Sequence, residues 1–269
     1  MSTRGGKVAL LGVVVAGFAF LYLPLVVLVV FSFNASKLVS VWGGWSAKWY
    51  LELFRNEQIL DAAWLSLKIA MINATGATLL GTMAGLALAR FGRFGGRTLF
   101  TGLIAAPLVM PDVIIGISLL LTFVSMEQFI GWPHGRGIDT ILIAHITFST
   151  AYVAIVVQSR ASGLDRSIEE AALDLGARPM TAFLLVTLPM LAPALASGWL
   201  LAFTLSLDDL VIASFVSGPG SSTLPMVIFS KVRLGVTPEI NALATLLIGA
   251  VALAAGAATW IQIRRSNRV

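Results

Sequence analysis

Repeated apolar runs of about 20 residues or more restrict the fold of this chain more than any other feature. A helix of that length spans a hydrocarbon core of roughly 30 Å. Charged residues form 12% of the sequence, well below the share of about a quarter that is usual in soluble domains, and they cluster between the apolar runs. The sequence therefore predicts an all-α integral membrane protein.

Six apolar runs indicate six transmembrane helices. Their approximate ranges are residues 8–31, 64–89, 99–124, 138–157, 191–216 and 241–263. The first run is too long for the apolar part of a signal peptide, so we interpret it as a membrane span. Gly81 and Gly85 in the second run form a small-xxx-small patch that permits close packing against another helix.

The charges between the runs predict the orientation. Residues 90–97 and the C-terminal tail are basic and contain no acidic residue, so the positive-inside rule places both in the cytoplasm. We expect both termini to be cytoplasmic, together with the loop at 158–190. The net charge of +5 then reports topology rather than nucleic-acid binding. The absence of cysteine excludes disulfides and thiolate chemistry.

Three regions follow from this pattern. Residues 1–60 hold the first transmembrane helix and an external segment, whose Trp42, Trp45, Trp49 and Tyr50 favour an anchor at the membrane interface. Residues 61–263 form the main transmembrane domain. A loop rich in Gly, Pro and Ser is expected at 217–240. Residues 264–269 are a basic cytoplasmic tail.

The polar stretch 164–189 carries a helical pattern of its own. Its apolar residues recur at helical spacing, and polar residues occupy the opposite face. The apolar set is Leu164, Ile168, Ala171, Ala172 and Leu175; the polar set is Arg166, Ser167, Glu169, Glu170 and Asp174. Such a helix either rests on lipid headgroups or docks onto a soluble partner. Its acidic face is unfavourable beside anionic lipid, which favours the partner.

The ends of this helix are also marked in the sequence. Ser167 and Glu170 have the spacing of a capping box, and Asp165 is a competing cap. Gly176 suits the position after a helix C-terminus, and Pro179 suits the first turn of the next helix. The sequence therefore predicts two short helices joined by a glycine turn.

The same stretch resembles the EAA motif of ABC-importer permeases. Glu170-Ala171-Ala172 is followed at the family's spacing by Gly176 and by Leu188-Pro189, with Val186 where the family pattern has Ile. Segments 106–114, 198–203, 205–215 and 238–243 resemble polyamine permeases, in particular the permease subunits of putrescine importers. The similarity covers nearly the whole chain.

This resemblance implies a type I ABC-importer permease fold in a bacterial inner membrane. The implied partners are a distinct second permease subunit, two cytoplasmic ATPase subunits that bind ATP and Mg²⁺, and a periplasmic polyamine-binding protein. The residues implied to couple the chain to the ATPase are Glu169, Glu170, Ala171, Ala172, Asp174 and Gly176. No G-x-x-x-x-G-K-[ST] phosphate loop is present, so we expect no catalytic residue, cofactor or metal ligand in this chain.

Acidic residues inside the apolar runs are candidates for the substrate pathway. A charge at the bilayer centre costs on the order of 2.5–3.5 kcal/mol, so it usually faces a cavity or a partner. Asp112, Asp208 and Asp209, with an aromatic face such as Trp199, would suit a diamine. Alternatively, Asp112 and Asp208 cap helices, or Asp208 pairs with another subunit. We expect His145 to be a packed, hydrogen-bonded residue rather than a proton relay, and Trp199 to be a packing residue rather than a ligand.

Other functions remain open from the sequence. The substrate could be spermidine or another cation rather than putrescine. A secondary carrier or channel without an ATPase is a different class, but no matching pair of inverted halves is evident, and such a carrier leaves the EAA stretch unexplained.

Overall fold

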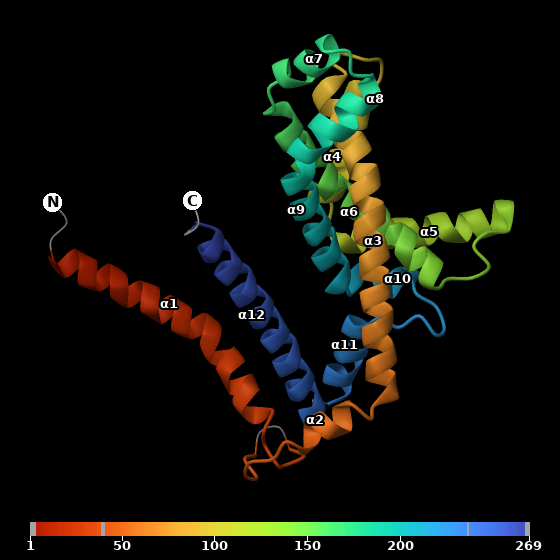
Figure 1. Ribbon diagram of the computed structural model, residues 1–269. Helices are drawn as coiled ribbons and strands as arrows, with labels where there is room; N and C mark the ends of the chain where they lie inside the picture. The colour runs from red at the N-terminus through yellow and green to blue at the C-terminus, as the bar shows by residue number, and fades with distance from the viewer. Residues whose placement is uncertain (1–3, 39–40, 236, 267–269) are drawn as a thin grey trace. The chain divides into compact units, whose positions relative to one another are not determined.

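The computed structural model describes residues 4–38, 41–235 and 237–266. This part of the chain is helical and contains no strand, only an isolated bridge between Asn34 and Trp45. The helices are α1 (Arg4–Phe31), α2 (Lys48–Leu53), α3 (Glu57–Arg90), α4 (Arg97–Val109), α5 (Asp112–Ile130), α6 (Ile138–Ser162), α7 (Ser167–Asp174), α8 (Pro179–Ala182), the π-helix η1 (Phe183–Thr187), α9 (Leu188–Leu207), α10 (Val211–Val216), α11 (Leu224–Leu234) and α12 (Pro238–Ser266) (Figure 1).

Five helical segments in the described part of the chain are long and apolar enough to cross a membrane. They are Leu10–Phe31, Glu57–Arg90, Asp112–Ile130, Ile138–Ser162 and Pro179–Leu207. Two shorter apolar helices are Arg97–Val109 and Pro238–Leu253. The all-α membrane class is confirmed. The count of six spans and the cytoplasmic position of both termini stay predictions.

The third predicted span, 99–124, is wrong as a single helix. α4 ends at Val109, Met110 adopts an extended conformation, and α5 begins at Asp112. The break lies immediately before Pro111, because a proline ring disfavours helical backbone in the residue that precedes it. α5 then continues to Ile130, beyond the predicted end of the span.

The fifth predicted span, 191–216, is also wrong as one helix. α9 begins at Leu188 and ends at Leu207, and α10 begins at Val211 after a three-residue break. The expected loop at 217–240 contains α11. α6 begins at Ile138 as predicted but continues to Ser162.

Two compact units make up the chain: one combines residues 1–60 with 228–269, and the other holds residues 61–227. In the first unit, α12 contacts both α1 and α2. The segment after α1 folds around Asn34, whose carbonyl accepts a hydrogen bond of 2.6 Å from the buried Trp49 indole. Trp42 and Trp45 are exposed and meet edge to face at 5.0 Å between ring centroids. Their position at the membrane interface stays a prediction.

In the second unit, α6 is the central helix and packs against α4, α9 and α10. Its contact with α3 depends on two glycines. A Cβ on Gly85 would lie 2.6 Å from the Ala154 carbonyl oxygen, and one on Gly81 would lie 2.6 Å from Val153 Cβ. At the predicted small-xxx-small patch, α3 and α6 therefore pack too closely to admit a Cβ without a shift.

Candidate functional site

α7 is the helix that carries the EAA stretch, and its start is fixed by Asp165. The Asp165 Oδ1 atom accepts a hydrogen bond of 2.9 Å from the Ser167 backbone N–H. This bond holds the pKa of the Asp165 carboxyl below its usual value. Of the two caps that the sequence offers, the structure uses Asp165. Ser167 is already the first helical residue, so the predicted capping box does not form.

The end of α7 is a Schellman turn at Gly176. This glycine has φ +88°, a conformation that strains any residue with a Cβ. Its N–H donates to the Leu173 carbonyl at 2.9 Å, and the Ala177 N–H donates to the Ala172 carbonyl at 3.1 Å. These two bonds satisfy carbonyls that the helix end would leave unpaired. α8 then begins with Pro179 in its first turn, as predicted.

α7 exposes its apolar residues instead of burying them. None of its residues is buried; Ile168 and Leu173 are exposed, and Leu175 beside them is 90% exposed. The acid Glu170 is exposed on the same helix, as are Ala171, Asp174 and Gly176, while Glu169 and Ala172 are half-buried. Figure 1 shows α7 and α8 together at one end of the second unit. An exposed mixed apolar and acidic helix suits docking to another protein.

α7 is tied to the end of α3 by two contacts. Arg90 Nη2 lies 3.4 Å from Glu169 Oε2 in an ion pair that is half-buried. Arg166 donates from Nη2 to the Ala89 carbonyl at 3.3 Å. The orientation of α7 is therefore coupled to α3 as well as to the segment that follows it.

A π-helical turn, η1, joins α8 to α9. The Leu188 N–H donates to the Phe183 carbonyl, five residues earlier. Pro189 follows directly and has no N–H to donate, so it removes a bond from the ladder of the preceding turn. π-turns inside α-helices are frequently found at functional sites. η1 was not predicted from the sequence, although Leu188-Pro189 was the signal that could have located it.

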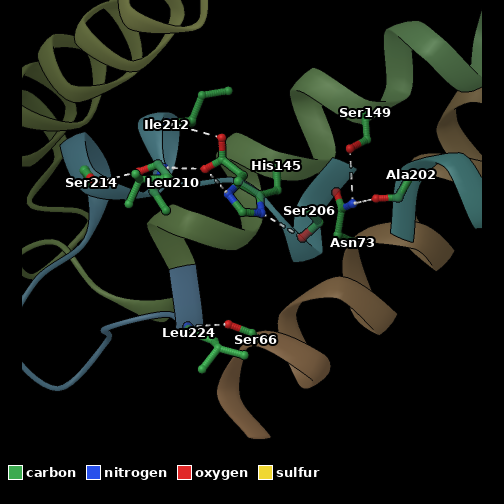
Figure 2. Close-up of polar contacts among 12 residues, drawn as sticks. Ser66, Asn73, His145, Ser149, Ala202, Ser206, Leu210, Ile212, Ser214 and Leu224 are labelled. Carbon is green, nitrogen blue, oxygen red and sulfur yellow. Dashed lines mark hydrogen bonds and ion pairs between the residues drawn. The ribbon is translucent and has the colours of Figure 1, made fainter. Parts of the chain in front are cut away.

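A second group of polar side chains lies inside the second unit, around His145 of α6 (Figure 2). His145 is 2% exposed. Its Nδ1 lies 2.7 Å from Ser206 Oγ on α9, and its Nε2 lies 3.1 Å from Asp209 Oδ2 in the break after α9. His145 is thus packed and hydrogen-bonded, as expected, but its pairing with Asp209 was not anticipated.

Asp208 and Asp209 occupy different environments although they are adjacent. The Asp209 carboxylate also accepts hydrogen bonds from the Ile212 N–H at 3.3 Å and the Ala213 N–H at 2.7 Å, so it caps α10. Asp208 is the last cap residue of α9 and is exposed. Among the described residues, the Asp208 carboxylate has no ion pair and accepts no hydrogen bond from another residue; it bonds its own backbone N–H.

Asn73 is a further buried polar residue, and the sequence did not predict its role. Its Nδ2 donates to Ser149 Oγ at 3.1 Å and to the Ala202 carbonyl at 2.8 Å, and Figure 2 shows these bonds joining α3, α6 and α9. Its Oδ1 is buried without a partner among the described residues. A lone amide within the second apolar run was the signal available for it.

The other two candidate pathway residues, Asp112 and Trp199, form no hydrogen bond or ion pair with Asp208 or Asp209 in the described part of the chain. Asp112 is the exposed first residue of α5, at a helix break, rather than the middle of a span. Trp199 stacks on Phe203 with 5.4 Å between centroids, and its Nε1 donates to Thr75 Oγ1 at 3.3 Å. Within the described residues, no group of three His, Asp or Glu side chains could hold a metal ion.

Comparison with known proteins gives consistent matches along the chain. Residues 77–264 match the family described as "Binding-protein-dependent transport system inner membrane component". The chain is 60% identical over 256 residues to the putrescine transport system permease protein PotI of Escherichia coli K12, covering 95% of this chain and 91% of that protein. It is 42% identical to the spermidine/putrescine transport system permease protein PotC of the same organism, covering 88% and 87%.

Solved structures share the fold at low sequence identity. A bacterial ABC transporter involved in the import of the acidic polysaccharide alginate superimposes with a TM-score of 0.76 and 16% identity, covering 96% of this chain and 98% of the other. The bacterial alginate ABC transporter in complex with its pentasaccharide-bound periplasmic protein gives a TM-score of 0.70 and 18% identity, covering 92% and 90%.

Proposed function

This chain belongs to the family of inner membrane components of binding-protein-dependent transport systems, and we propose that it imports putrescine or a related polyamine. It is a multi-pass protein of the inner membrane. The observation that carries the substrate class is the 60% identity to a putrescine permease over 95% of the chain. The relative named for both spermidine and putrescine is 42% identical, which makes spermidine the second candidate.

The proposed complex contains this chain, a distinct second permease subunit, two cytoplasmic ATPase subunits and a periplasmic polyamine-binding protein. The solved alginate importer with its periplasmic protein supports the last of these partners by analogy of fold. ATP and Mg²⁺ bind the ATPase subunits in this proposal, and this chain has no catalytic role. Its contribution is to bind, admit and release the polyamine.

We assign coupling to the ATPase to α7, with Glu169, Glu170, Ala171, Ala172, Asp174 and Gly176. The support is the exposure of Ile168 and Leu173 on α7, none of whose residues is buried, and of Leu175, which follows the helix directly. A movement of α7 would be transmitted along one continuous helical segment, because Pro179–Leu207 runs without interruption through η1. At about 1.5 Å per residue this segment is roughly 44 Å long. Asp208 follows directly after Leu207, the last residue of this segment.

For the polyamine itself, Asp208 and Asp209 have separate proposed roles. The free, exposed carboxylate of Asp208 suits a passing ammonium group, because a weak and reversible attraction permits release. The carboxylate of Asp209 is already hydrogen-bonded to His145 and to two backbone N–H groups. We therefore assign it a structural role beside the pathway and not that of a free ligand. Asp112 and Trp199 stay candidates for other points of the pathway.

Uptake of labelled putrescine by the reconstituted complex tests the proposal. We expect uptake to require ATP and the binding protein, and unlabelled putrescine to compete better than spermidine. Glu170→Lys should abolish uptake while membrane insertion stays normal. The matched control is Glu52→Lys, a charge reversal on the exposed face of α2, which should retain uptake. Transport without any ATPase subunit, unaffected by Glu170→Lys, would show a secondary carrier instead.

A further inference from the structure

One buried imidazole holds the chain on both sides of Asp208. Nδ1 of His145 lies 2.7 Å from Oγ of Ser206, two residues before Asp208. Nε2 of the same ring lies 3.1 Å from Oδ2 of Asp209, one residue after it. The ring is 2% exposed, and Figure 2 shows its bond to Ser206. The exposed acid at this break therefore lies between two points of attachment to α6.

The two attachments use both nitrogens of a ring that needs no charge. An ionised carboxylate can only accept hydrogen bonds, so Nε2 of His145 donates to Asp209. In the neutral ring, Nδ1 then accepts a hydrogen bond from the Ser206 hydroxyl. A neutral ring avoids the cost of burying an unpaired charge among apolar helices. The imidazole is therefore suited to hold the chain in one fixed arrangement.

The second attachment leads to a helix that is itself fixed at both ends. At the start of α10, the Asp209 carboxylate accepts a hydrogen bond of 2.7 Å from the Ala213 N–H. At its end, the Val216 carbonyl accepts one of 2.6 Å from Oγ1 of Thr140 on α6. Ile212, Ala213 and Val216 are buried. Because α10 is bonded to α6 at each end, the break before it has a rigid support.

Asp208 depends on this support for its position. Its backbone N–H donates to the Thr204 carbonyl at 3.2 Å, while its carboxylate has no partner among the other described residues. The place of that carboxylate is therefore set by the backbone around it, which the imidazole holds. A charged group attracts a passing ligand best when it is already in position, because no reorganisation is then required.

We propose that His145 is a positioning residue for polyamine transport. By holding Ser206 and Asp209, it fixes the place of the Asp208 carboxylate that meets the ammonium groups of the polyamine. This inference rests on the proposed function, since it takes Asp208 as the carboxylate of the pathway. A merely structural histidine acts on the stability of the whole unit, whereas a positioning histidine acts on transport through Asp208. The two roles differ in how substitutions at His145 and Asp208 combine.

A double-mutant cycle in the reconstituted complex tests the proposal. The measurement is the amount of polyamine imported per ATP hydrolysed, with saturating binding protein, and is made with putrescine and with spermidine. His145→Asn does not reach both partners and should lower this ratio by about three- to tenfold, the effect of one lost hydrogen bond. Asp208→Asn should lower it at least as much. Adding His145→Asn to Asp208→Asn should lower it no further, because the carboxylate to be positioned is already absent.

A conservative variant tests the contact to Asp209 directly. Glutamine has an amide that can donate a hydrogen bond as Nε2 of the imidazole does. His145→Gln should therefore stay within about twofold of the wild type, since it keeps the bond to Asp209. A ratio as low as that of His145→Asn overturns the positioning role of this bond.

Two buried serines provide a matched pair of variants. Ser206→Ala removes the hydroxyl that bonds the imidazole, and Ser149→Ala removes one on α6 that bonds Asn73 at 3.1 Å instead. The effect of Ser206→Ala should disappear when Asp208 is replaced by Asn, whereas that of Ser149→Ala should be unchanged. If His145→Asn does not assemble, the Ser206→Ala cycle decides the question.

The outcomes separate this inference from the proposed function. Effects of His145→Asn and Ser206→Ala that are the same with and without Asp208→Asn overturn the positioning role alone. Import by Asp208→Asn at the wild-type ratio overturns the role of Asp208, and the positioning role with it. A wild-type complex that imports neither putrescine nor spermidine overturns the proposed function itself.

Discussion

His145 on α6 holds Asp209 across the break between α9 and α10, with 3.1 Å between Nε2 and Oδ2. Ser206 fixes the other ring nitrogen at 2.7 Å. Two helices that the sequence presents as one span are therefore bent apart around a buried imidazole. The adjacent carboxylate of Asp208 has no ion pair with a described residue at the same break. One carboxylate at this break, that of Asp209, is therefore held by hydrogen bonds, and the other, that of Asp208, has no partner residue in this part of the chain.

The pair Asp208 and Asp209 gives the first prediction. Asp209→Ala removes the cap of α10 and leaves His145 without its carboxylate, so we expect the complex to lose about 1–3 kcal/mol of stability. Asp208→Ala should change stability by less than about 0.5 kcal/mol but reduce putrescine uptake strongly. Thermal unfolding in detergent and uptake in proteoliposomes measure the two effects. Normal stability of Asp209→Ala would contradict the supporting role.

Gly176 gives the second prediction. Gly176→Ala forces a Cβ into the left-handed region, at about 1–2 kcal/mol, and should uncouple ATP hydrolysis from uptake by weakening the end of α7. Gly176→Asn should be milder, because asparagine tolerates this conformation. Gly163→Ala is the control, since its φ of −91° suits alanine and its Cβ meets only ordinary contacts. The ratio of ATP hydrolysed to putrescine imported is the measurement.

The approach of α3 to α6 gives the third prediction. Gly85→Ala places a Cβ 2.6 Å from a backbone carbonyl oxygen that cannot move without shifting α6. We expect a loss of about 1–3 kcal/mol, as for other overpacked contacts. Gly102→Ala in α4 meets nothing within 4 Å and should not destabilise the protein. Thermal unfolding compares the two, and similar melting temperatures would show that α3 is free to move away.

Asp165 gives a prediction about pH. The Ser167 N–H lowers the pKa of this carboxyl in the folded protein, so its cap stabilises α7 above the unfolded pKa of about 3.9. That contribution is lost as pH falls through the lower folded pKa. Asp165→Asn keeps a capping oxygen at every pH and should remove this dependence. Hydrogen exchange at residues 167–170, compared between the two proteins at each pH, tests it.

The EAA stretch shows how much of the candidate site the sequence predicted. The two short helices, the turn at Gly176 and the start of α8 at Pro179 follow from local preferences that act within a few residues. Even there, the choice of Asp165 over the Ser167 capping box needed the structure. The role of α7 in coupling stays a proposal that the exposure of Leu175 and its neighbours supports.

The intramembrane polar groups were predicted less well. The sequence marked Asp208, Asp209 and His145 as unusual, but the bond between His145 and Asp209 joins residues 64 positions apart, and no local pattern encodes it. Asn73, which ties α3 to α6 and α9, was overlooked for the same reason. Asp112 was placed inside a span, and it lies instead at a break that Pro111 causes.

The sequence by itself determined the membrane class, the helical content, the polar stretch with its glycine turn and the family motif. Each depends on composition or on spacing along the chain. Only the tertiary structure decided where the third and fifth runs break, and that a π-turn joins α8 to α9. It also decided that the Asp209 carboxylate is held by His145 while the Asp208 carboxylate has no partner among the other described residues. A membrane span is apolar on every face, because lipid surrounds it. The pattern of apolar residues therefore does not specify which other helices the span packs against. Buried hydrogen bonds and close glycine contacts specify them instead.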